Sequence, residues 1–554
     1  MTSSRRWSRL IGVGVLTLAA CSEPAAGTTT TGPPQPITTT PGSTTSTIDD
    51  SCPDVFCVIY HIRPEATWSD GAPVVGADFA YTLDLVTDPL ASGSGNPGYS
   101  LITADRVLDD KTYMIAMSRV FSPWRTLFDI VLPAHAEYDP DAPGPVTGPF
   151  IFVERVEGDR IVLDRNPWHT PQDGSPAGDV RQLRFVFPGS VRNMIGDLEN
   201  GAVDLIDLRP LDWTIEDISG IEGIDYRVGP GPFWEHVTFN HDDPLLTQRW
   251  VRELIALAID REAILDLTVR GIDPSAVPLG NTVWMQGSPS YLDQFRIGHD
   301  PALAEQMMID RFCERGDDDV YSCQGRRMSF IWATSVGDPF REAQVDLAVE
   351  RMEAIGVEIV PLLLTPSDLF SPEVIFGDHR VWQIISFSWK AAADPFLGDS
   401  TYQCQGTGPH GMGALNVNRY CREEVDSLIT STGAILDPDE RSRVYNEADR
   451  LYLEDVAVIP LYQKPSFLAW RSTIAGPELN PGATPMWNVG SWSGQETVVV
   501  ALEIEPTALV PLVPANDATA VVRSAMYQGA FSVTPRLEYV PALVSGADTI
   551  VNGG

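Results

Sequence analysis

The stretch that decides the fold reads VIYHIRPEATWSDGAPVVGADFAYTLDLV, from Val58 to Val86. An apolar run ends at Ile62-Arg63, and the polar segment Trp68-Ser69-Asp70-Gly71 follows it. Asp-Gly favours a tight turn, and Asp78 can cap the helix that its apolar successors predict. A strand, a turn and a helix in this order are typical of a mixed α/β protein.

A second unit, between residues 328 and 364, supports the same class. Met328 to Thr334 is an apolar run expected to form a buried strand, and Asp338-Pro339 opens a helical pattern. Gly356 suits the end of that helix, and Val357 to Leu364 is a second strand. Strand, helix and strand predict a right-handed crossover between parallel strands.

The composition of the chain limits the kinds of molecule that the protein can bind. The chain has 554 residues, enough for two or three domains, and a net charge of -37. Such acidity repels polyanions, so nucleic acid is excluded as a partner. The lysines are Lys111, Lys390 and Lys464, and arginine supplies the remaining positive charge.

The N-terminus predicts export and anchoring. Residues 1–21 combine a basic start with an apolar run, Leu10 to Ala20, that is too short to span a bilayer. The run ends in LAAC, which resembles a bacterial lipobox in which Cys21 receives the lipid. An ordinary secretory signal with a chance cysteine is the alternative. Residues 22–50 are rich in Thr and Pro and are expected to be a disordered tether. We therefore expect a lipid-anchored protein on the extracytoplasmic face of the cell membrane.

The other cysteines form an even set, which in an exported chain suggests disulfides. Sequence-local pairing is favoured, which joins Cys52 with Cys57, Cys313 with Cys323, and Cys404 with Cys421. Their spacings match no CxxC pattern, so a metal site is the weaker alternative.

No enzyme motif is evident. Gly-x-Ser-x-Gly, His-Glu-x-x-His and Gly-x-x-x-x-Gly-Lys are all missing from the sequence. The eight histidines are scattered and indicate no dedicated metal site. We expect a binding protein without cofactor or metal rather than an enzyme.

Several segments together resemble the extracellular solute-binding proteins of family 5, the peptide- and nickel-binding components of ABC importers. The match begins with Ile62-Arg63, Trp68 to Gly71, and Ala77-Asp78. Further matches in family order are Thr147 to Trp168, Leu198 to Asp207, Phe239 to Ile264, Ala392 to Phe396, and Trp487 to Trp492. The resemblance covers roughly residues 51–554.

The resemblance implies a large, two-lobed, three-subdomain α/β fold of the periplasmic-binding-protein type, with a hinge and a ligand cleft between the lobes. Lobe 1 is expected to comprise residues 51–265 and 466–554, including a family subdomain at about 64–145. Lobe 2 is expected to comprise residues 266–465.

The order of the segments differs from that of the family. GQETVVVALEIEPTALVPLV, from Gly494 to Val513, resembles the strand and loop with which family members begin. Ala520 to Phe531 and Leu537 to Gly546 resemble the helix and strand that follow. We infer a circular permutation in which 494–554 is the family's N-terminal segment, with a broken tandem duplication as the alternative. Permutation predicts that Asp50 and Gly554 lie close together, on neighbouring strands.

The resemblance also suggests ligand contacts. Trp389 matches an aromatic position that lines the family's pocket, and a core tryptophan is the alternative. Further candidates are Phe233, Trp234 and His236 before Asn240, and Asn516 and Asp517 in the loop after the opening strand. The aspartate with which peptide binders hold a ligand's α-ammonium is replaced by Ala392. Asp394 could substitute only after a loop shift, and Lys390 favours an anionic group. A free-peptide ligand is therefore in doubt.

The expected function is that of a substrate-binding lipoprotein, monomeric, which captures a peptide or other small solute and delivers it to ABC permease subunits. A solute-sensing lipoprotein without transport is the alternative, and a secreted envelope hydrolase is a distant one.

Overall fold

A computed structural model describes residues 51–88, 96–171, 176–208, 212–377, 380–406, 408, 412–513 and 516–552. The predicted signal segment, the tether, Cys21, Asp50 and Gly554 lie outside the described residues. Among the residues described, no helix has the length and apolar character needed to cross a membrane.

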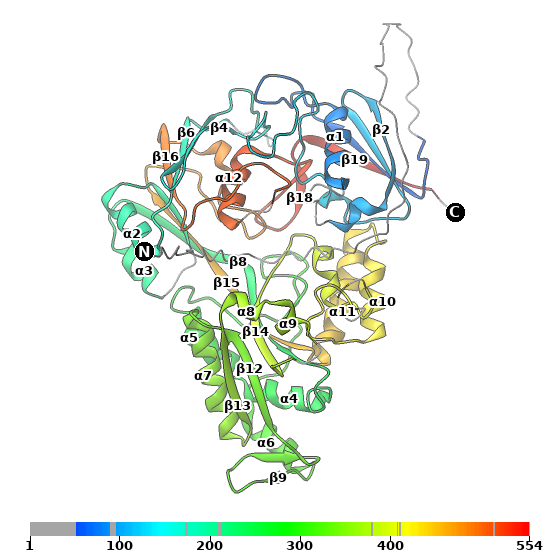
Figure 1. Ribbon diagram of the computed structural model, residues 1–554, viewed down its shortest axis with the longest axis vertical. Helices are drawn as coiled ribbons and strands as arrows, with labels where there is room; N and C mark the ends of the chain where they lie inside the picture. The colour runs from blue at the N-terminus through cyan, green and yellow to red at the C-terminus, as the bar shows by residue number, and fades with distance from the viewer. Residues whose placement is uncertain are drawn as a thin grey trace, which may run out of the picture.

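One sheet of ten strands runs through the length of the molecule (Figure 1). Its strand order is β13-β12-β14-β8-β15-β7-β16-β6-β5-β4. The strands are β4 (Phe150–Val156), β5 (Arg160–Arg165), β6 (Gln182–Val186), β7 (Leu205–Leu208), β8 (Ile224–Phe239), β12 (Ser329–Ser335), β13 (Glu358–Leu364), β14 (Ile384–Lys390), β15 (Val458–Arg471) and β16 (Thr497–Ala501).

The two long strands, β8 and β15, connect the lobes. β8 and β15 pair with each other along most of their length, while the second half of β8 also pairs with β14 and the second half of β15 also pairs with β7. Their antiparallel register shifts between Gln463 and Pro465, opposite the segment Pro230–Pro232. Proline donates no ladder hydrogen bond, which explains the irregularity at this crossing. The sheet therefore passes from lobe to lobe through a short, irregular hinge.

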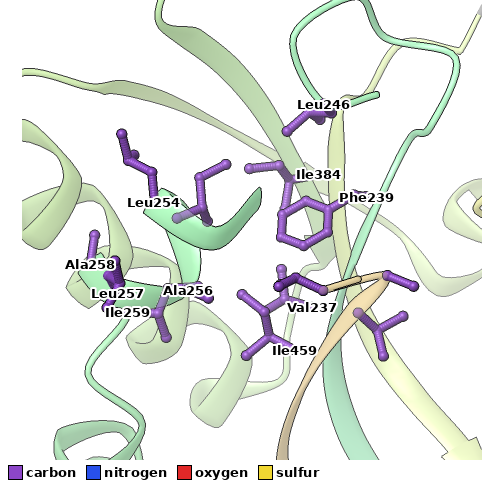
Figure 2. Packing of buried hydrophobic residues seen from close by; sticks show 14 of the residues in the cluster. Val237, Phe239, Leu246, Leu254, Ala256, Leu257, Ala258, Ile259, Ile384 and Ile459 are labelled. Atoms are coloured by element: carbon purple, nitrogen blue, oxygen red, sulfur yellow. The ribbon is translucent and has the colours of Figure 1, made fainter. Parts of the chain in front are cut away.

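Lobe 2 has a large core of its own. Figure 2 shows Val237 and Phe239 of β8 packed with Leu254 of α4, Ile384 of β14 and Ile459 of β15. Its helices are α4 (Arg249–Ala258), α5 (Arg261–Thr268), α6 (Pro301–Ile309), α7 (Pro339–Ala354), α8 (Pro366–Leu369), α9 (Pro372–Ile375), α10 (Glu423–Thr432) and α11 (Pro438–Glu454). Strands β12 and β13 pair in parallel around α7, as the sequence predicts.

The packing favours a different lobe boundary from the predicted one. Residues 237–265, assigned to lobe 1 from the sequence, contribute Val237, Leu254 and Ile264 to the same core as Tyr321 and Tyr462. A boundary at the hinge near Pro230–Pro232 fits this packing better than one between residues 265 and 266.

Lobe 1 contains several further cores, and two of them are large. One lies under the four-stranded sheet β19-β1-β3-β2 and buries Trp68, Phe79 and Phe128. The other lies between the lobe 1 half of the long sheet and α12. The remaining elements are α1 (Gly76–Thr87), α2 (Val191–Asn200), α3 (Asp212–Ser219), α12 (Asp517–Met526), β1 (Phe56–Ile62), β2 (Ile102–Asp109), β3 (Thr112–Met117), β17 (Phe531–Val533), β18 (Tyr539–Pro541) and β19 (Val544–Val551).

The Trp68–Asp78 stretch is held by its own polar groups. Gly71 has φ +86°, and the Asp70 carboxylate accepts from the Ala72 N–H. Asp78 is the third residue of the α1 start rather than its cap, and its carboxylate accepts from Val75 N–H at 2.8 Å and Trp68 Nε1 at 3.0 Å. This stretch is structural.

All three predicted disulfides are present, which joins Cys52 with Cys57, Cys313 with Cys323, and Cys404 with Cys421. The Cys313–Cys323 bond ties the end of α6 to the small sheet β9 (Glu314–Arg315), β10 (Tyr321–Cys323) and β11 (Arg326–Arg327) at the tip of lobe 2 (Figure 1). Local pairing is confirmed.

The strands nearest the two ends of the described chain are neighbours. β1 pairs antiparallel with β19, with Phe56 opposite Val551, and the Asn552 N–H donates to Val55 O at 3.0 Å. β16 lies between β6 and β7 and is parallel to both. The predicted adjacency of the end strands is thus confirmed for the described residues.

Candidate ligand-binding site

The hinge brings four of the predicted ligand contacts together. In the antiparallel pairing of β14 with β8, Trp389 lies opposite Trp234 and Lys390 lies opposite Phe233. These residues lie at the end of the lobe 2 half of the long sheet, next to the irregular pairing of β8 with β15. The β-ladder register therefore places three aromatic rings and one ammonium group at the junction of the lobes.

An apolar cluster at this junction, here called the interlobe aromatic cluster, joins the two lobes. Its buried members are Trp234, Leu279 and Met285, and its partly buried members are Tyr291, Trp389, Ala391 and Leu537. Leu537 comes from the turn between β17 and β18 of lobe 1, whereas the other members belong to lobe 2. Separation of the lobes would therefore expose part of this cluster.

A concave surface of about 630 Å³ adjoins the cluster and shares Tyr291 with it. The Tyr291 hydroxyl accepts from the Gly280 N–H at 2.9 Å, which fixes the ring beside the opening. Both polar and apolar side chains line the surface, which comprises Arg261, Glu262, Val277, Pro278, Gln286, Gly287, Ser288, Tyr291, Asp293 and Phe295. Aromatic walls with a few fixed polar groups are typical of sites for small ligands.

Lys390 is the exposed cation of this region. Its Nζ lies 5.9 Å from the centre of the Phe233 ring, and it forms no ion pair with any carboxylate that the structure describes. The attraction between an ammonium group and an aromatic face is weak, so the Lys390 ammonium can also bind an anionic group of a ligand.

A buried ionic network lies directly behind the aromatic residues. Glu235 is completely buried, and its carboxylate accepts from Arg341 at 3.0 and 3.3 Å and from Ser388 Oγ at 2.6 Å. Lys464 Nζ is 3.0 Å from the same carboxylate. Burial alone would raise the pKa of Glu235, but Arg341 and Lys464 outweigh it and hold the pKa well below its usual value. The network ties β8, α7, β14 and β15 together at the hinge.

His236 lies behind the wall rather than on it. Its ring is fully buried and packs on Trp234 at 4.8 Å and Phe387 at 4.6 Å, and its Nδ1 is 2.9 Å from Thr238 Oγ1. Burial lowers the pKa of His236 to about 3, so the ring is neutral. In this arrangement His236 supports the aromatic residues and does not face solvent.

Asp394, Asn516 and Asp517 are placed differently from the four hinge residues. Asp394 is buried, and both of its oxygens accept from Arg441, at 2.7 and 2.8 Å. Asn516 caps α12 by accepting from the Thr519 N–H, and Asp517 is the first residue of that helix. Neither Asn516 nor Asp517 belongs to the interlobe aromatic cluster.

A second contact joins the lobes farther along the junction. The Ser122 N–H donates to Gly433 O at 2.8 Å, and its hydroxyl donates to Thr432 O at 2.7 Å. The rings of Phe121 and Phe396 meet edge to face, with their centroids 5.0 Å apart. The lobes thus touch at both the cluster and the loop before Trp124.

Sequence reasoning missed five members of the cluster, Leu279, Met285, Tyr291, Ala391 and Leu537. They lie in loops without periodicity, where no local pattern marks a binding role. One signal was present for the hinge, because Lys390 and Lys464 are two of the three lysines in the chain. Among the residues described, no group of three or more His, Cys, Asp or Glu could hold a metal ion.

Two lobes, a two-strand hinge and an aromatic cluster between the lobes define the class of two-lobed solute-binding proteins. The sequence profile of the bacterial extracellular solute-binding proteins, family 5 Middle, matches residues 47–407. The chain belongs to this family. Its members bind solutes outside the cytoplasm and are binding proteins rather than enzymes.

Relatives of the chain include an oligopeptide-binding protein and a probable glycolipid-binding protein. The oligopeptide-binding protein OppA of Mycobacterium tuberculosis (strain H37Rv) is 29% identical over 453 residues, which cover 77% of this chain and 72% of OppA. The probable monoacyl phosphatidylinositol tetramannoside-binding protein LpqW of the same strain is 24% identical and covers 63% of this chain and 60% of LpqW.

Solved structures share the fold. The periplasmic EDTA-binding protein EppA matches with a TM-score of 0.69 at 20% identity, covering 79% of this chain and 85% of EppA. AppA of Bacillus subtilis, in complex with a nonapeptide, matches with a TM-score of 0.60 at 17% identity, covering 79% of this chain and 87% of AppA. These likenesses establish the two-lobed fold.

Proposed function

We propose that this chain is the substrate-binding component of an ABC importer and that it captures a peptide or another small solute between its lobes. The observation that carries the proposal is the interlobe aromatic cluster, in which Leu537 of lobe 1 meets Trp234 and Trp389 of lobe 2 at the hinge. Hinge closure around a ligand is the working motion of such proteins. Phe233 and Lys390 would complete the lobe 2 wall, and His236 would support it from behind.

The mature protein would be anchored through a lipid on Cys21 and held away from the membrane by residues 22–50. It would act as a monomer that presents its ligand to permease subunits. A change of Cys21 to Ser should move the protein from the detergent phase to the aqueous phase in a phase-partition assay. Detergent partition of both forms would contradict lipidation at this residue.

A change of Trp389 to Ala tests the proposed binding. Loss of a large aromatic contact at a ligand wall costs about 2 kcal/mol or more, which weakens binding about 30-fold. The assay is calorimetric titration of residues 51–554 with a pool of short peptides, and the control is Trp168→Ala, an exposed tryptophan of lobe 1. Equal affinity of wild type and Trp389→Ala would contradict the proposed site.

Transport and sensing predict different effects of deleting the protein on uptake of its ligand by the cell. If the protein delivers its ligand, its deletion should abolish uptake of that ligand, and wild type but not Trp389→Ala should restore it. Normal uptake after deletion would favour the alternative of a solute sensor.

We also propose that the segment order is a circular permutation of the family's order. The pairing of β1 with β19 and the position of β16 between β6 and β7 support it. A chain rearranged to run 494–552, a short Gly-Ser linker and then 51–493 should fold and bind as the natural chain does. Failure to fold would contradict the proposal, because Asn552 Nδ2 already donates to Cys52 O at 2.8 Å.

A further inference from the structure

The contacts between the lobes that lie away from the hinge form a compact set, here called the interlobe latch. It consists of Phe121 and Ser122 of lobe 1 and of Phe396, Thr432 and Gly433 of lobe 2. In Figure 1 the helices α10 and α11 of lobe 2 lie directly below the part of lobe 1 that contains α1 and β19, and the latch joins these two parts. All five residues lie outside the interlobe aromatic cluster, so the lobes are joined at two separate places.

The polar part of the latch is formed at the C-terminal end of α10. The last carbonyl groups of a helix have no partner within the helix. The Ser122 hydroxyl donates to Thr432 O at 2.7 Å, and the Ser122 N–H donates to Gly433 O at 2.8 Å. Ser122 is 8% exposed and Thr432 is fully buried, so these bonds are shielded from water. Lobe 1 therefore supplies partners for carbonyl groups of lobe 2.

The apolar part of the latch is a phenylalanine of lobe 2 that packs in lobe 1. Phe396 lies in the short helical turn Pro395–Thr401, and it packs against the lobe 1 core that contains Phe121, Trp124 and Phe128. The ring planes of Phe121 and Phe396 meet at 82°, with their centroids 5.0 Å apart, which is a favourable edge-to-face arrangement. Separation of the lobes would break this contact and expose the Phe396 ring.

A buried ion pair holds the two lobe 2 parts of the latch in one geometry. Arg441 donates to both oxygens of Asp394, at 2.7 and 2.8 Å, and its Nε donates to Thr432 O at 3.2 Å. Asp394 Oδ1 also accepts from the Phe396 N–H at 3.0 Å. A bidentate pair of arginine and carboxylate adds geometric specificity to its energy. The pair thus fixes the Thr432 carbonyl and the Phe396 backbone in the positions that meet lobe 1.

Every contact of the latch is made between groups of the protein itself. The latch therefore favours the closed arrangement of the lobes with or without a solute between them. A ligand, by contrast, shifts the equilibrium between open and closed protein only by its difference in affinity for the two. One hydrogen bond and one aromatic pair together change such an equilibrium about 10- to 100-fold.

We propose that the interlobe latch holds the lobes closed in the ligand-free protein as well as in the complex, so that a solute enters after the latch opens and is retained when it forms again. The proposal rests on the proposed function, because it concerns solute capture by the same pair of lobes. Ser122 and Phe396 are positioning residues in this account. They set the populations of open and closed protein, whereas the aromatic wall at the hinge contacts the solute.

The test variants are Ser122→Ala, Phe396→Ala and the two changes together. Ser122→Ala should fold, because Arg441 Nε still donates to Thr432 O. The matched controls are Ser118→Ala, whose hydroxyl donates to Leu101 O within lobe 1, and Leu397→Ala, which removes an exposed side chain next to Phe396.

Two measurements are made on residues 51–554. Small-angle X-ray scattering gives the radius of gyration of the protein without ligand. Stopped-flow tryptophan fluorescence gives the rates of association and dissociation of the tightest peptide found in dipeptide, tripeptide and hexapeptide pools.

The double variant should have a larger radius of gyration than wild type, and added peptide should reduce the difference. Association should be faster, because more of the protein is open. Dissociation should be about 10- to 100-fold faster, because the closed complex loses the same contacts. Each single variant should change in the same direction by less, and both controls should behave as wild type.

Three outcomes would overturn the proposal. Equal radii of gyration for wild type and the double variant would show that the latch does not hold the ligand-free lobes together. Unchanged rates with a lowered melting temperature would show that the contacts are only structural. Slower association by either single variant would show that the residue contacts the solute directly. Binding of no peptide by wild type would count against the proposed function, and the scattering comparison would then decide on the latch by itself.

Discussion

Removal of Arg341 from the buried network at the hinge gives the sharpest stability prediction. Arg341→Met keeps an unbranched apolar stem but leaves the fully buried Glu235 with Lys464 and Ser388 as its partners. The change removes two hydrogen bonds to Glu235, at 3.0 and 3.3 Å, one to Ser335 Oγ at 2.7 Å and one to Ser388 Oγ at 3.0 Å. Breaking a buried pair by removing one partner costs about 3 to 5 kcal/mol. Because Lys464 remains, we expect a loss of about 3 kcal/mol in the free energy of unfolding.

The assay is urea unfolding of residues 51–554 at several pH values, with Glu235→Gln/Arg341→Met as the control. The double variant should recover most of the loss, because no buried charge is left unpaired. The pKa of Glu235 is lowered in the folded wild type, so its contribution is present above the unfolded pKa of about 4.3 and is lost as the pH falls. The difference between wild type and Arg341→Met should therefore narrow below about pH 5. A loss under about 1 kcal/mol at pH 7, or a difference that stays constant down to pH 4, would refute the reasoning.

Two further predictions concern the hinge and the tip of lobe 2. A Cβ at Gly231 would meet Ser466 Oγ at 2.6 Å and Lys464 O at 2.7 Å, so Gly231→Ala should separate β8 from β15 and lower stability by about 1 to 3 kcal/mol. Gly229→Ala is the matched control, since its Cβ would meet only Leu479 Cδ1 at 3.3 Å, and equal melting temperatures of the two variants would contradict the hinge packing. Replacing Cys313 and Cys323 together by Ser should cost about 2 to 3 kcal/mol in urea unfolding, because the bond closes a short loop. An unchanged urea midpoint would show that this bond adds no stability.

Much of the fold could be predicted because local signals agreed with the tertiary structure. The apolar runs around Asp338-Pro339 and Gly356 have the periods of a strand, a helix and a strand, and β12, α7 and β13 follow them. The segment after Gly494 has an alternating β pattern, and β16 occupies the middle of the lobe 1 sheet. Local cysteine pairing was predictable because short loops favour closure.

The lobe boundary could not be predicted from local pattern. The apolar face of α4 predicts a buried helix, but it does not indicate whether the helix packs in the core of lobe 1 or of lobe 2. The hinge itself lies within two continuous strands rather than in a linker between domains. Its signals are the Gly-Pro-Gly-Pro run at residues 229–232 and Pro465, but glycine and proline also occur at bulges and sheet edges.

The candidate site was predicted in part. Trp389, Trp234, Phe233 and Lys390 meet because β14 pairs with β8, which no single segment specifies. Asp394 resembled a ligand contact in sequence, but its partner Arg441 is distant along the chain.

The most direct test of the central claim, that a solute is held between the lobes at the hinge, is a crystal structure of residues 51–554 with the tightest ligand from the peptide pools. The account predicts ligand density in contact with Trp389 and Trp234 of lobe 2 and with Leu537 of lobe 1. Ligand density on an outer face of either lobe, with none at the interlobe aromatic cluster, would contradict it.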